Sequence, residues 1–281
     1  MKKKLAIFLA FIIGIVFFWY LQVNWLTVNT IEIKLKYLPN SFEKVTIIHI
    51  TDLHSKEFGK NNQTLINRIN RLGGDIIVMT GDMRHNDPED EGEAFINLIK
   101  NLKTDVPIYY VTGEHEEGRY YADYHKLGLE GTKNSYEDKL RDLGVVVLND
   151  EKKIWKKGND KINIYGLSYK FRDEQTLDER LGITQHDNVN LLLVHKACDF
   201  EKYVDWGADL ILSGDTHGGI VRIPFLGGLL SSDGTLFPEY DAGLYEKNNS
   251  KMFVSRGLGN HPVEFRLFNR PEIAVISLIK E

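Results

Sequence analysis

Acidic residues and histidines recur at one kind of position in this sequence, directly after short apolar runs of the type that form buried strands. In chain order they are Asp52 and His54 in ITDLHS, Asp82 in MTGDMR, Glu114, His115 and Glu116 in VTGEHEEG, His195 in LLLVHK, and Asp215 and His217 in SGDTHGG. Mixed oxygen and nitrogen ligands suit divalent metals of hard or intermediate softness. A pair of such ions can activate water and stabilise a phosphoryl group under attack. These residues therefore predict a two-metal hydrolytic site.

Each of these groups also has a structural explanation when it is taken alone. A Gly-Asp pair after a strand is often only a turn, and His195 by itself would more often be a hydrogen-bonded core histidine. Turn chemistry does not account for five successive strand-end loops that all carry oxygen or nitrogen ligands. The metal site rests on the whole set.

The elements that must position these residues alternate between strand and helix in the first half of the chain. We expect strands at 30–37, 44–51, 75–82, 106–111, 144–149, 162–168, 189–195, 208–215, 251–258 and 272–280, and helices at 62–70, 91–102 and 135–143. In α/β sheets, the loops beyond the carboxyl ends of strands converge on one crevice. Strands dominate the second half, so the pattern predicts a layered α/β domain.

Composition limits the other possibilities. The chain has 281 residues, of which 42% are apolar, and a net charge of −5 without a basic stripe, which argues against nucleic-acid binding. The single cysteine, Cys198, excludes an internal disulfide and is expected to pack as a small apolar residue. No repeat or linker interrupts residues 31–281, so we expect one catalytic domain and a monomer.

Residues 1–30 are predicted to form a membrane anchor. Three lysines precede LAIFLAFIIGIVFFWYL, and no charge follows before Glu32. About 20 apolar residues span the hydrocarbon core of a bilayer. A cleaved signal peptide is the alternative, but QVNWLTVNT has no small-residue cleavage site. The lysines predict a single-pass protein of the cell membrane whose catalytic domain lies outside the cytoplasm.

The motif set resembles that of the calcineurin-like metallophosphoesterases, whose pattern is Asp-x-His, Gly-Asp, Gly-Asn-His-Asp/Glu, a strand-end His, and Gly-His-x-His. Here the matching segments are DLH, GD, GEHE, LLLVH and GDTHGG, and the resemblance runs from about Lys44 to the C-terminus. VSRGLG and NRPEI near the end are similar to a membrane-associated branch that includes UDP-2,3-diacylglucosamine pyrophosphohydrolase-like proteins. The resemblance implies a β-sandwich flanked by helices.

The resemblance also implies a role for each matching residue. Asp52, His54 and His217 would bind the first metal, Asp82 would bridge both metals, and His195 would bind the second. His115 would act as a general acid for the leaving group rather than as a ligand, and Glu116 would orient it. Arg84, two residues after Asp82, is expected to grip a substrate phosphate or to be an exposed loop arginine.

Two residues depart from the family pattern, and both belong to the second metal site. Glu114 replaces an asparagine and Asp215 replaces a histidine. Both replacements can still bind a metal, so we expect the site to be retained, although loss of the second ion is the alternative. The added carboxylates would lower the net charge of the loaded centre from about +2 to about 0. Oxygen ligands favour Mn²⁺ or Mg²⁺ at the second site, while iron or zinc suits the first.

The segment IPFLGGLLSSDGTLFPEY, residues 223–240, is unusually apolar for a stretch rich in glycine. It either completes the core or forms an apolar lip beside the metals, near the bilayer. The second possibility favours a phosphorylated small-molecule or lipid-linked substrate. The expected function is a membrane-anchored metal-dependent phosphohydrolase acting on a phosphoester or pyrophosphate. The alternative is a catalytically weak or silent relative that binds a phosphorylated envelope ligand or a protein.

Overall fold

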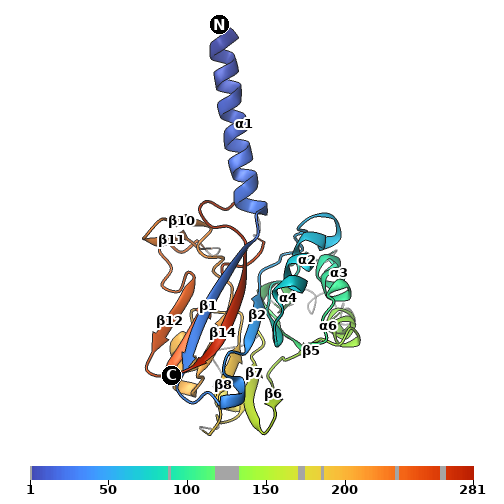
Figure 1. Ribbon diagram of the computed structural model, residues 1–281, viewed down its shortest axis with the longest axis vertical. Coiled ribbons are helices and arrows are strands. Elements are labelled where there is room, and N and C mark those ends of the chain that lie inside the picture. The colour runs from blue at the N-terminus through green and yellow to red at the C-terminus, as the bar shows by residue number, and fades with distance from the viewer. Residues whose placement is uncertain are drawn as a thin grey trace.

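Two six-stranded sheets form the centre of the molecule (Figure 1). The structure is a computed structural model and describes residues 2–87, 90–117, 133–169, 175–184, 187–231, 234–259 and 264–281. The first sheet has the order β1 (Thr27–Leu35), β14 (Glu272–Lys280), β2 (Thr46–Ile50), β3 (Ile76–Thr80), β4 (Ile108–Val111) and β5 (Val146–Val147). The second has the order β12 (Gly243–Lys247), β13 (Ser250–Val254), β9 (Leu210–Ser213), β8 (Asn190–Leu193), β7 (Asp160–Gly166) and β6 (Glu151–Lys157).

Helices cover the outer faces of both sheets. The helices of the described chain are α1 (Lys2–Asn24), α2 (Gln63–Leu72), α3 (Glu93–Asn101), α4 (Glu114–Glu117), α6 (Lys133–Asp142), α7 (Leu177–Leu181) and α8 (Phe200–Trp206), with short 3-10 turns at Asn40–Phe42 and Lys60–Asn62. Leu65 and Ile69 of α2 pack with Phe95 of α3 against the first sheet. Phe200 and Tyr203 of α8 pack on the second. The predicted layered α/β fold is confirmed.

The inner core lies between the two sheets. Ile47 and Val78 of the first sheet share one buried cluster with Leu191, Leu212 and Phe253 of the second. In the sequence these strands are continuous apolar runs. The structure explains the pattern, because both faces of each strand are covered. Strands dominate the second half, as expected. It also contains α7 and α8, whose five and seven residues are too short to show a clear helical period.

The ligand-bearing strands all end at the same edge of the molecule. β2, β3 and β4 are parallel neighbours in the first sheet. β7, β8 and β9 are parallel neighbours in the second. Their carboxyl-terminal loops therefore meet across the sandwich, as the sequence predicted.

The N-terminal helix α1 extends away from this body (Figure 1). It is long and apolar enough to cross a membrane, and side chains such as Phe8, Phe11 and Phe17 are exposed. β1 begins at Thr27, before the expected domain boundary at residue 31. Only two residues separate the helix from the strand, so α1 joins the folded domain without a long linker.

The structure corrects one local expectation and decides one alternative that the sequence left open. Cys198 is exposed rather than packed in the core, because it lies in the loop between β8 and α8. The apolar segment 223–240 does not complete the core. It contains part of a hairpin, β10 (Val221–Ile223) with β11 (Gly227–Leu230), and exposes Phe225, Leu226 and Phe237.

Candidate metal centre

Hydrogen bonds between loops hold the first two ligand groups together. The Asp52 amide donates to the Gly81 carbonyl over 3.1 Å, and the His54 amide donates to the Asp82 carbonyl over 3.0 Å. The ladder between β2 and β3 thus continues past the strand ends. It places DLH beside GD before any side-chain interaction is considered.

Five of the predicted metal ligands form two buried groups that share Asp52. The first contains Asp52, His54 and His217, and the second contains Asp52, Asp82 and His195. In the first group, His54 Nε2 lies 3.2 Å from His217 Nε2. In the second, His195 Nε2 lies 3.3 Å from Asp82 Oδ2. Two ligands about 2.1 Å from one ion lie roughly 3.0–3.4 Å apart, so both groups fit a divalent metal.

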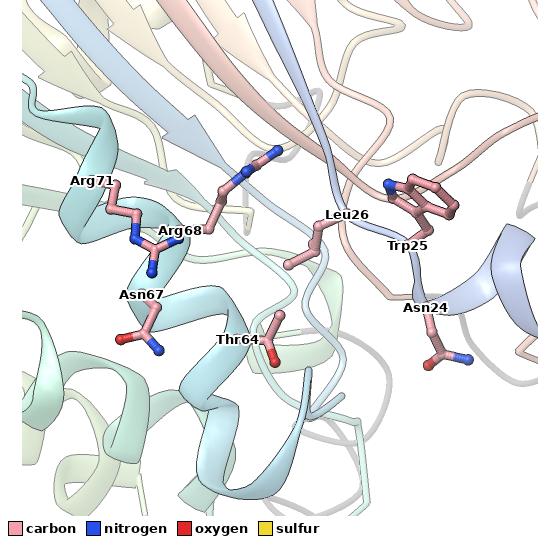
Figure 2. A pocket seen from close by; sticks show the side chains of 7 residues that line it. All are labelled: Asn24, Trp25, Leu26, Thr64, Asn67, Arg68 and Arg71. Atoms are coloured by element: carbon pink, nitrogen blue, oxygen red, sulfur yellow. The ribbon is translucent and has the colours of Figure 1, made fainter.

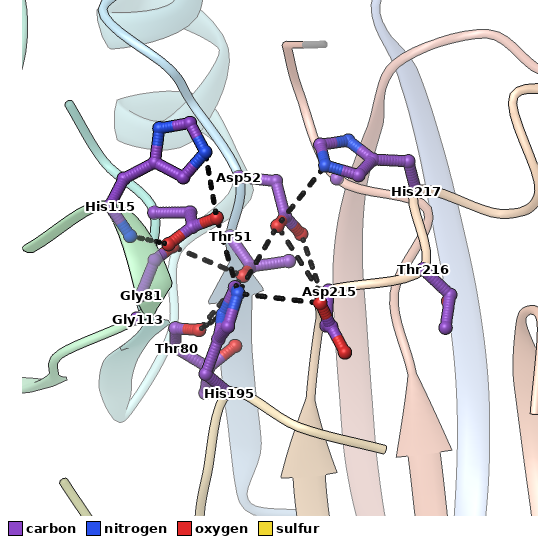
Figure 3. Close-up of polar contacts among 12 residues, drawn as sticks. Thr51, Asp52, Thr80, Gly81, Gly113, His115, His195, Asp215, Thr216 and His217 are labelled. Atoms are coloured by element: carbon purple, nitrogen blue, oxygen red, sulfur yellow. Dashed lines mark hydrogen bonds and ion pairs between the residues drawn. The ribbon is translucent and has the colours of Figure 1, made fainter. Parts of the chain in front are cut away.

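The carboxylates of Asp52 and Asp82 both lie between the two groups. Asp82 Oδ2 is 3.8 Å from His54 Nε2 in addition to its approach to His195. Asp52 Oδ1 is 3.7 Å from His217 Nε2 and 4.0 Å from His195 Nε2. Either carboxylate could therefore contribute an oxygen to both groups. Figure 3 shows His195 beside the carboxylates of Asp52 and Asp215.

Hydrogen bonds at Nδ1 orient two of the candidate ligand histidines. His195 Nδ1 donates to the Thr80 carbonyl over 2.7 Å, and His217 Nδ1 donates to the Gly259 carbonyl over 3.1 Å. Because a carbonyl oxygen only accepts, each Nε2 keeps a lone pair that points into the centre. The buried Nε2 of His195 faces carboxylate oxygens, 3.3 Å from Asp82 Oδ2 and 3.8 Å from Asp215 Oδ1. A nitrogen in these surroundings holds either a proton or a metal ion, and a divalent metal fits this position.

The electrostatics indicate the same need for positive charge. Burial raises the pKa of Asp52 to about 7 although His195 opposes the shift, and burial also raises the pKa of Asp215 to about 6. Burial alone would lower the pKa of His195, but Asp82, Asp52 and Asp215 hold it well above its usual range. Bound cations would replace the protons that these groups otherwise retain.

His115 has the opposite orientation to the two ligand histidines. Its Nδ1 accepts from the Asn86 amide over 3.0 Å, so in the neutral ring the proton is on Nε2. Nε2 lies 3.8 Å from Asp82 Oδ2, and the His115 amide donates to Asp82 Oδ1 over 2.8 Å. The ring therefore presents a donor to the centre rather than a lone pair, which is what a general acid requires.

Glu116 is engaged with backbone rather than with the solvent. Its carboxylate accepts from the amides of Asp82, Met83 and Gly113 over 2.8–2.9 Å. These bonds connect the loop after β3 to the loop after β4. The described hydrogen bonds of Glu116 go to backbone amides rather than to the His115 ring, so its predicted orienting role stays a prediction.

The ligand loops contain backbone conformations that are uncommon for residues other than glycine. Asp52, His54, Asp82, Asp215 and His217 all have positive φ, between 47° and 77°. Such conformations cost energy and persist where the surrounding structure imposes them. Their concentration on the ligands indicates that the loops are shaped by the geometry of the centre.

Glycines allow the loops to approach closely. A Cβ on Gly214 would lie 2.3 Å from Thr51 Oγ1 and 2.5 Å from Asp52 Oδ2. Gly81 has a φ of 88°, and a Cβ there would lie 2.6 Å from the backbone of Gly113. The motif glycines are therefore needed both for the turn at Gly81 and for contact between loops.

The two departures from the family pattern lie on the His195 side of the centre. Asp215 Oδ1 is 3.8 Å from His195 Nε2, and the Asp215 amide donates to Asp52 over 3.3 Å. Glu114 is exposed and belongs to neither ligand group above. The charge of Glu114 contributes to the raised pKa of Asp215. Its charge and its hydrogen bond to the hydroxyl also contribute to the raised pKa of Tyr169. Its role as a ligand stays a prediction.

Sequence analysis missed Tyr169 and His85. Tyr169 follows β7 at the same edge of the sandwich, and its ring lies edge-on to His195 at 6.1 Å between centroids. Burial, and next the charge of Glu114, raise its pKa. His85 forms a further potential ligand group with His54 and His115. The strand-end position of Tyr169 was a usable signal, but tyrosine was not among the residue types considered.

Arg84 interacts beside the centre rather than with its ligands. Its guanidinium donates to the Asp90 carbonyl over 2.7 Å and lies 5.5 Å from the centre of the Tyr136 ring. Neither partner belongs to the ligand groups. A contact between Arg84 and a substrate phosphate stays a prediction.

Comparison with known proteins identifies the family. A family model for the calcineurin-like phosphoesterases matches residues 45–219, which include all the ligand loops. The chain belongs to this family. It is therefore a metallophosphoesterase, a hydrolase of phosphoester bonds.

Relatives extend the similarity over most of the chain. It is 29% identical to the metallophosphoesterase YkuE of Bacillus subtilis over 264 residues, covering 92% of this chain and 87% of the relative. It is 23% identical to the phosphodiesterase YaeI of Escherichia coli, covering 92% and 91%. A transmembrane protein with a metallophosphoesterase domain from Bos taurus is 26% identical, covering 89% of this chain and 56% of the relative. This relative and α1 together suggest membrane anchoring.

Proposed function

We propose that α1 anchors this phosphohydrolase in the cell membrane, with the catalytic domain outside the cytoplasm. We further propose that the metal centre cleaves a phosphoester or pyrophosphate bond in a lipid-linked substrate at the membrane surface. The observation that carries the proposal is the position of the ligand loops, which lie at the end of the sandwich where α1 enters.

The register of the first sheet supports this position. β1 starts beside the start of β14, with Thr27 opposite Glu272. β14 is antiparallel to β2, so its start also lies beside the end of β2. The Glu272 amide donates to the Gly257 carbonyl, and the Gly259 amide donates to the Asp52 carbonyl. Residues 257–259 join these two hydrogen bonds, and three residues span at most about 10 Å. The end of α1 and the ligand loops therefore share one edge of the domain.

An apolar rim at the same end of the molecule supports a lipid-linked substrate. Phe225 and Leu226 at the tip of the β10–β11 hairpin are exposed. The hairpin is joined to segment 264–270 by a bond from the Arg222 amide to the Leu267 carbonyl. The next residue, Phe268, contacts Phe18 of α1 at 6.0 Å between ring centroids. The hairpin therefore lies next to the helix, as Figure 1 shows.

Two sets of residues would hold the two metal ions. Asp52, His54 and His217 would hold the first ion, and Asp82, His195 and Asp215 the second, with Glu114 at its edge. When bound, a pair of divalent ions activates water and withdraws charge from the phosphoryl group. Manganese or magnesium suits the oxygen-rich second position.

His115 supplies the proton in this proposal. Its Nε2 proton faces the centre because the Asn86 amide occupies Nδ1. It can donate this proton to the leaving oxygen as the phosphorus–oxygen bond breaks, and Nε2 then regains a proton from water, because an imidazole that has lost its only ring proton is strongly basic. Asp82 holds the backbone of His115 in place.

The experiment compares two substrates with the same scissile bond. The full-length protein in vesicles should hydrolyse a lipid-linked phosphodiester or pyrophosphate with a higher kcat/KM than the water-soluble head group of that lipid. His115→Ala should lower both rates while the ratio remains. Equal kcat/KM for the two substrates would contradict the lipid-linked proposal. Absence of hydrolysis of either substrate and of bis-p-nitrophenyl phosphate with Mn²⁺ would contradict catalysis itself.

A further inference from the structure

A pocket separates α2 from the segment that directly follows α1 (Figure 2). Its volume is about 390 Å³. Asn24, Trp25 and Leu26 line one side, and Arg68 and Arg71 line the other together with neighbouring polar residues of α2. Neither side contributes to the metal centre.

The amphipathic pattern of α2 creates the polar wall. Thr64, Asn67, Arg68 and Arg71 are spaced three or four residues apart and share one face of the helix. All four are exposed. The opposite face, which includes Leu65, Ile66 and Ile69, is buried against the first sheet. Packing of α2 therefore fixes the direction in which the two arginines project.

The pocket carries positive charge without a matching acid. Among the described residues, neither Arg68 nor Arg71 is paired with a carboxylate. Guanidinium groups bind phosphate through paired hydrogen bonds, and the side-chain amide of Asn67 supplies a further donor, whereas that of Asn24 donates to the Tyr20 carbonyl. The chemistry of the pocket fits a phosphate ester.

The depth of the pocket relative to the membrane determines which phosphate ester can reach it. Asn24 is the last residue of α1, and Trp25 follows it with 54% of its surface exposed. Tryptophan at the end of a spanning helix lies at the level of lipid head groups. If α1 crosses the membrane as proposed above, the pocket lies among the head groups of the leaflet where the helix ends.

We infer that this pocket binds the head group of an anionic glycerophospholipid. Such a lipid would tie α2 to the membrane at a second point beside α1. The metal centre, which lies at the same edge of the domain, would then face the bilayer in one fixed orientation. The inference rests on the proposed anchor but not on the catalytic mechanism.

The test measures lipid binding to the full-length protein in detergent by native mass spectrometry. Phosphatidylglycerol should be retained more tightly than phosphatidylcholine. Arg68→Gln/Arg71→Gln should weaken phosphatidylglycerol binding by at least about tenfold, since the double variant loses the charge-assisted hydrogen bonds from guanidinium to phosphate. The matched control Lys153→Gln/Lys156→Gln removes two exposed charges from β6 and should leave binding unchanged.

Three results would overturn the inference. The first is equal retention of phosphatidylglycerol by the arginine double variant and by the unaltered protein. The second is binding of soluble glycerol phosphate as tight as that of the lipid, which would indicate a site for free anions. The third is release of the full-length chain from membranes by alkaline carbonate, which would remove the anchor. Unchanged hydrolysis of bis-p-nitrophenyl phosphate by both double variants would show that they are folded, and keeps this test separate from that of the proposed catalysis.

Discussion

At the residue scale, the orientation of each imidazole separates ligand from acid. His195 and His217 donate through Nδ1 to carbonyl groups and present lone pairs. His115 accepts at Nδ1 and presents a proton. Three histidines that look alike in the sequence are therefore distinguished by the backbone group that each one faces.

His115→Ala should lower kcat for bis-p-nitrophenyl phosphate by roughly 10²- to 10⁴-fold, the usual contribution of a general acid. The metal content, measured by elemental analysis, should stay the same because His115 is not expected to be a ligand. His195→Ala is the comparison, since it should lower both metal content and rate. Loss of metal in His115→Ala would assign this residue to the ligands instead.

The pair of added acids gives a second prediction at this scale. The unaltered protein should bind two ions per chain, and Glu114→Asn/Asp215→His should also bind two but with a stronger preference for Zn²⁺ over Mn²⁺. The reason is that a nitrogen ligand replaces an oxygen. One ion in the unaltered protein and two in the double variant would show that the second site had been lost.

Metal affinity should increase with pH between about 5.5 and 7.5. In the metal-free protein the pKa of Asp52 is raised to about 7 and that of Asp215 to about 6, mainly by burial. Below these values the carboxyl groups hold protons that the metal must displace, and above them they are already ionised. Calorimetric titration with Mn²⁺ in buffers of different ionisation enthalpy should detect proton release at pH 6 and less at pH 8. An affinity independent of pH would contradict these shifts.

At the element scale, the strand-end loops could be predicted and their connections could not. A buried apolar run followed by Asp or His marks the end of a strand, and parallel strands bring such ends together. This rule found Asp52, Asp82, His195 and His217. The sequence does not reveal that Glu116 joins two loops through backbone amides, because that role depends on how far the loops lie apart. The hairpin at 221–230 was missed because its strands are short and rich in glycine.

Glu116→Gln should destabilise the loops that this carboxylate connects. The substitution places an amide donor where backbone amides already donate, at a residue that is only 8% exposed. We expect the free energy of unfolding to fall by about 1–3 kcal/mol, measured by chemical denaturation. Glu246→Gln, at an exposed side chain of β12, should leave it unchanged. Equal stability of all three proteins would show that the Glu116 bonds are dispensable.

At the scale of the whole molecule, one edge of the sandwich brings together the N-terminal helix α1, the candidate metal centre and the apolar hairpin. The sequence shows the apolar N-terminal segment and the candidate ligands as separate features. Their common position follows from strand direction, since β1 and β14 run opposite to β2. Strand order and direction are long-range properties that local patterns do not specify.

The single cysteine provides a test of membrane orientation. Cys198 is exposed on the catalytic domain. In intact cells, a membrane-impermeant maleimide should label the full-length protein if the domain lies outside the cytoplasm, and Cys198→Ser should abolish labelling. Labelling only after the cells are opened would place the domain in the cytoplasm.

The central claim is that distant loops meet around a pair of divalent cations. The most direct measurement is anomalous X-ray scattering from crystals loaded with Mn²⁺. We predict two peaks, one within about 2.3 Å of Asp52, His54 and His217 and the other equally close to Asp82 and His195. A well-folded crystal with no peak among these residues, at a Mn²⁺ concentration that supports hydrolysis, would contradict the account.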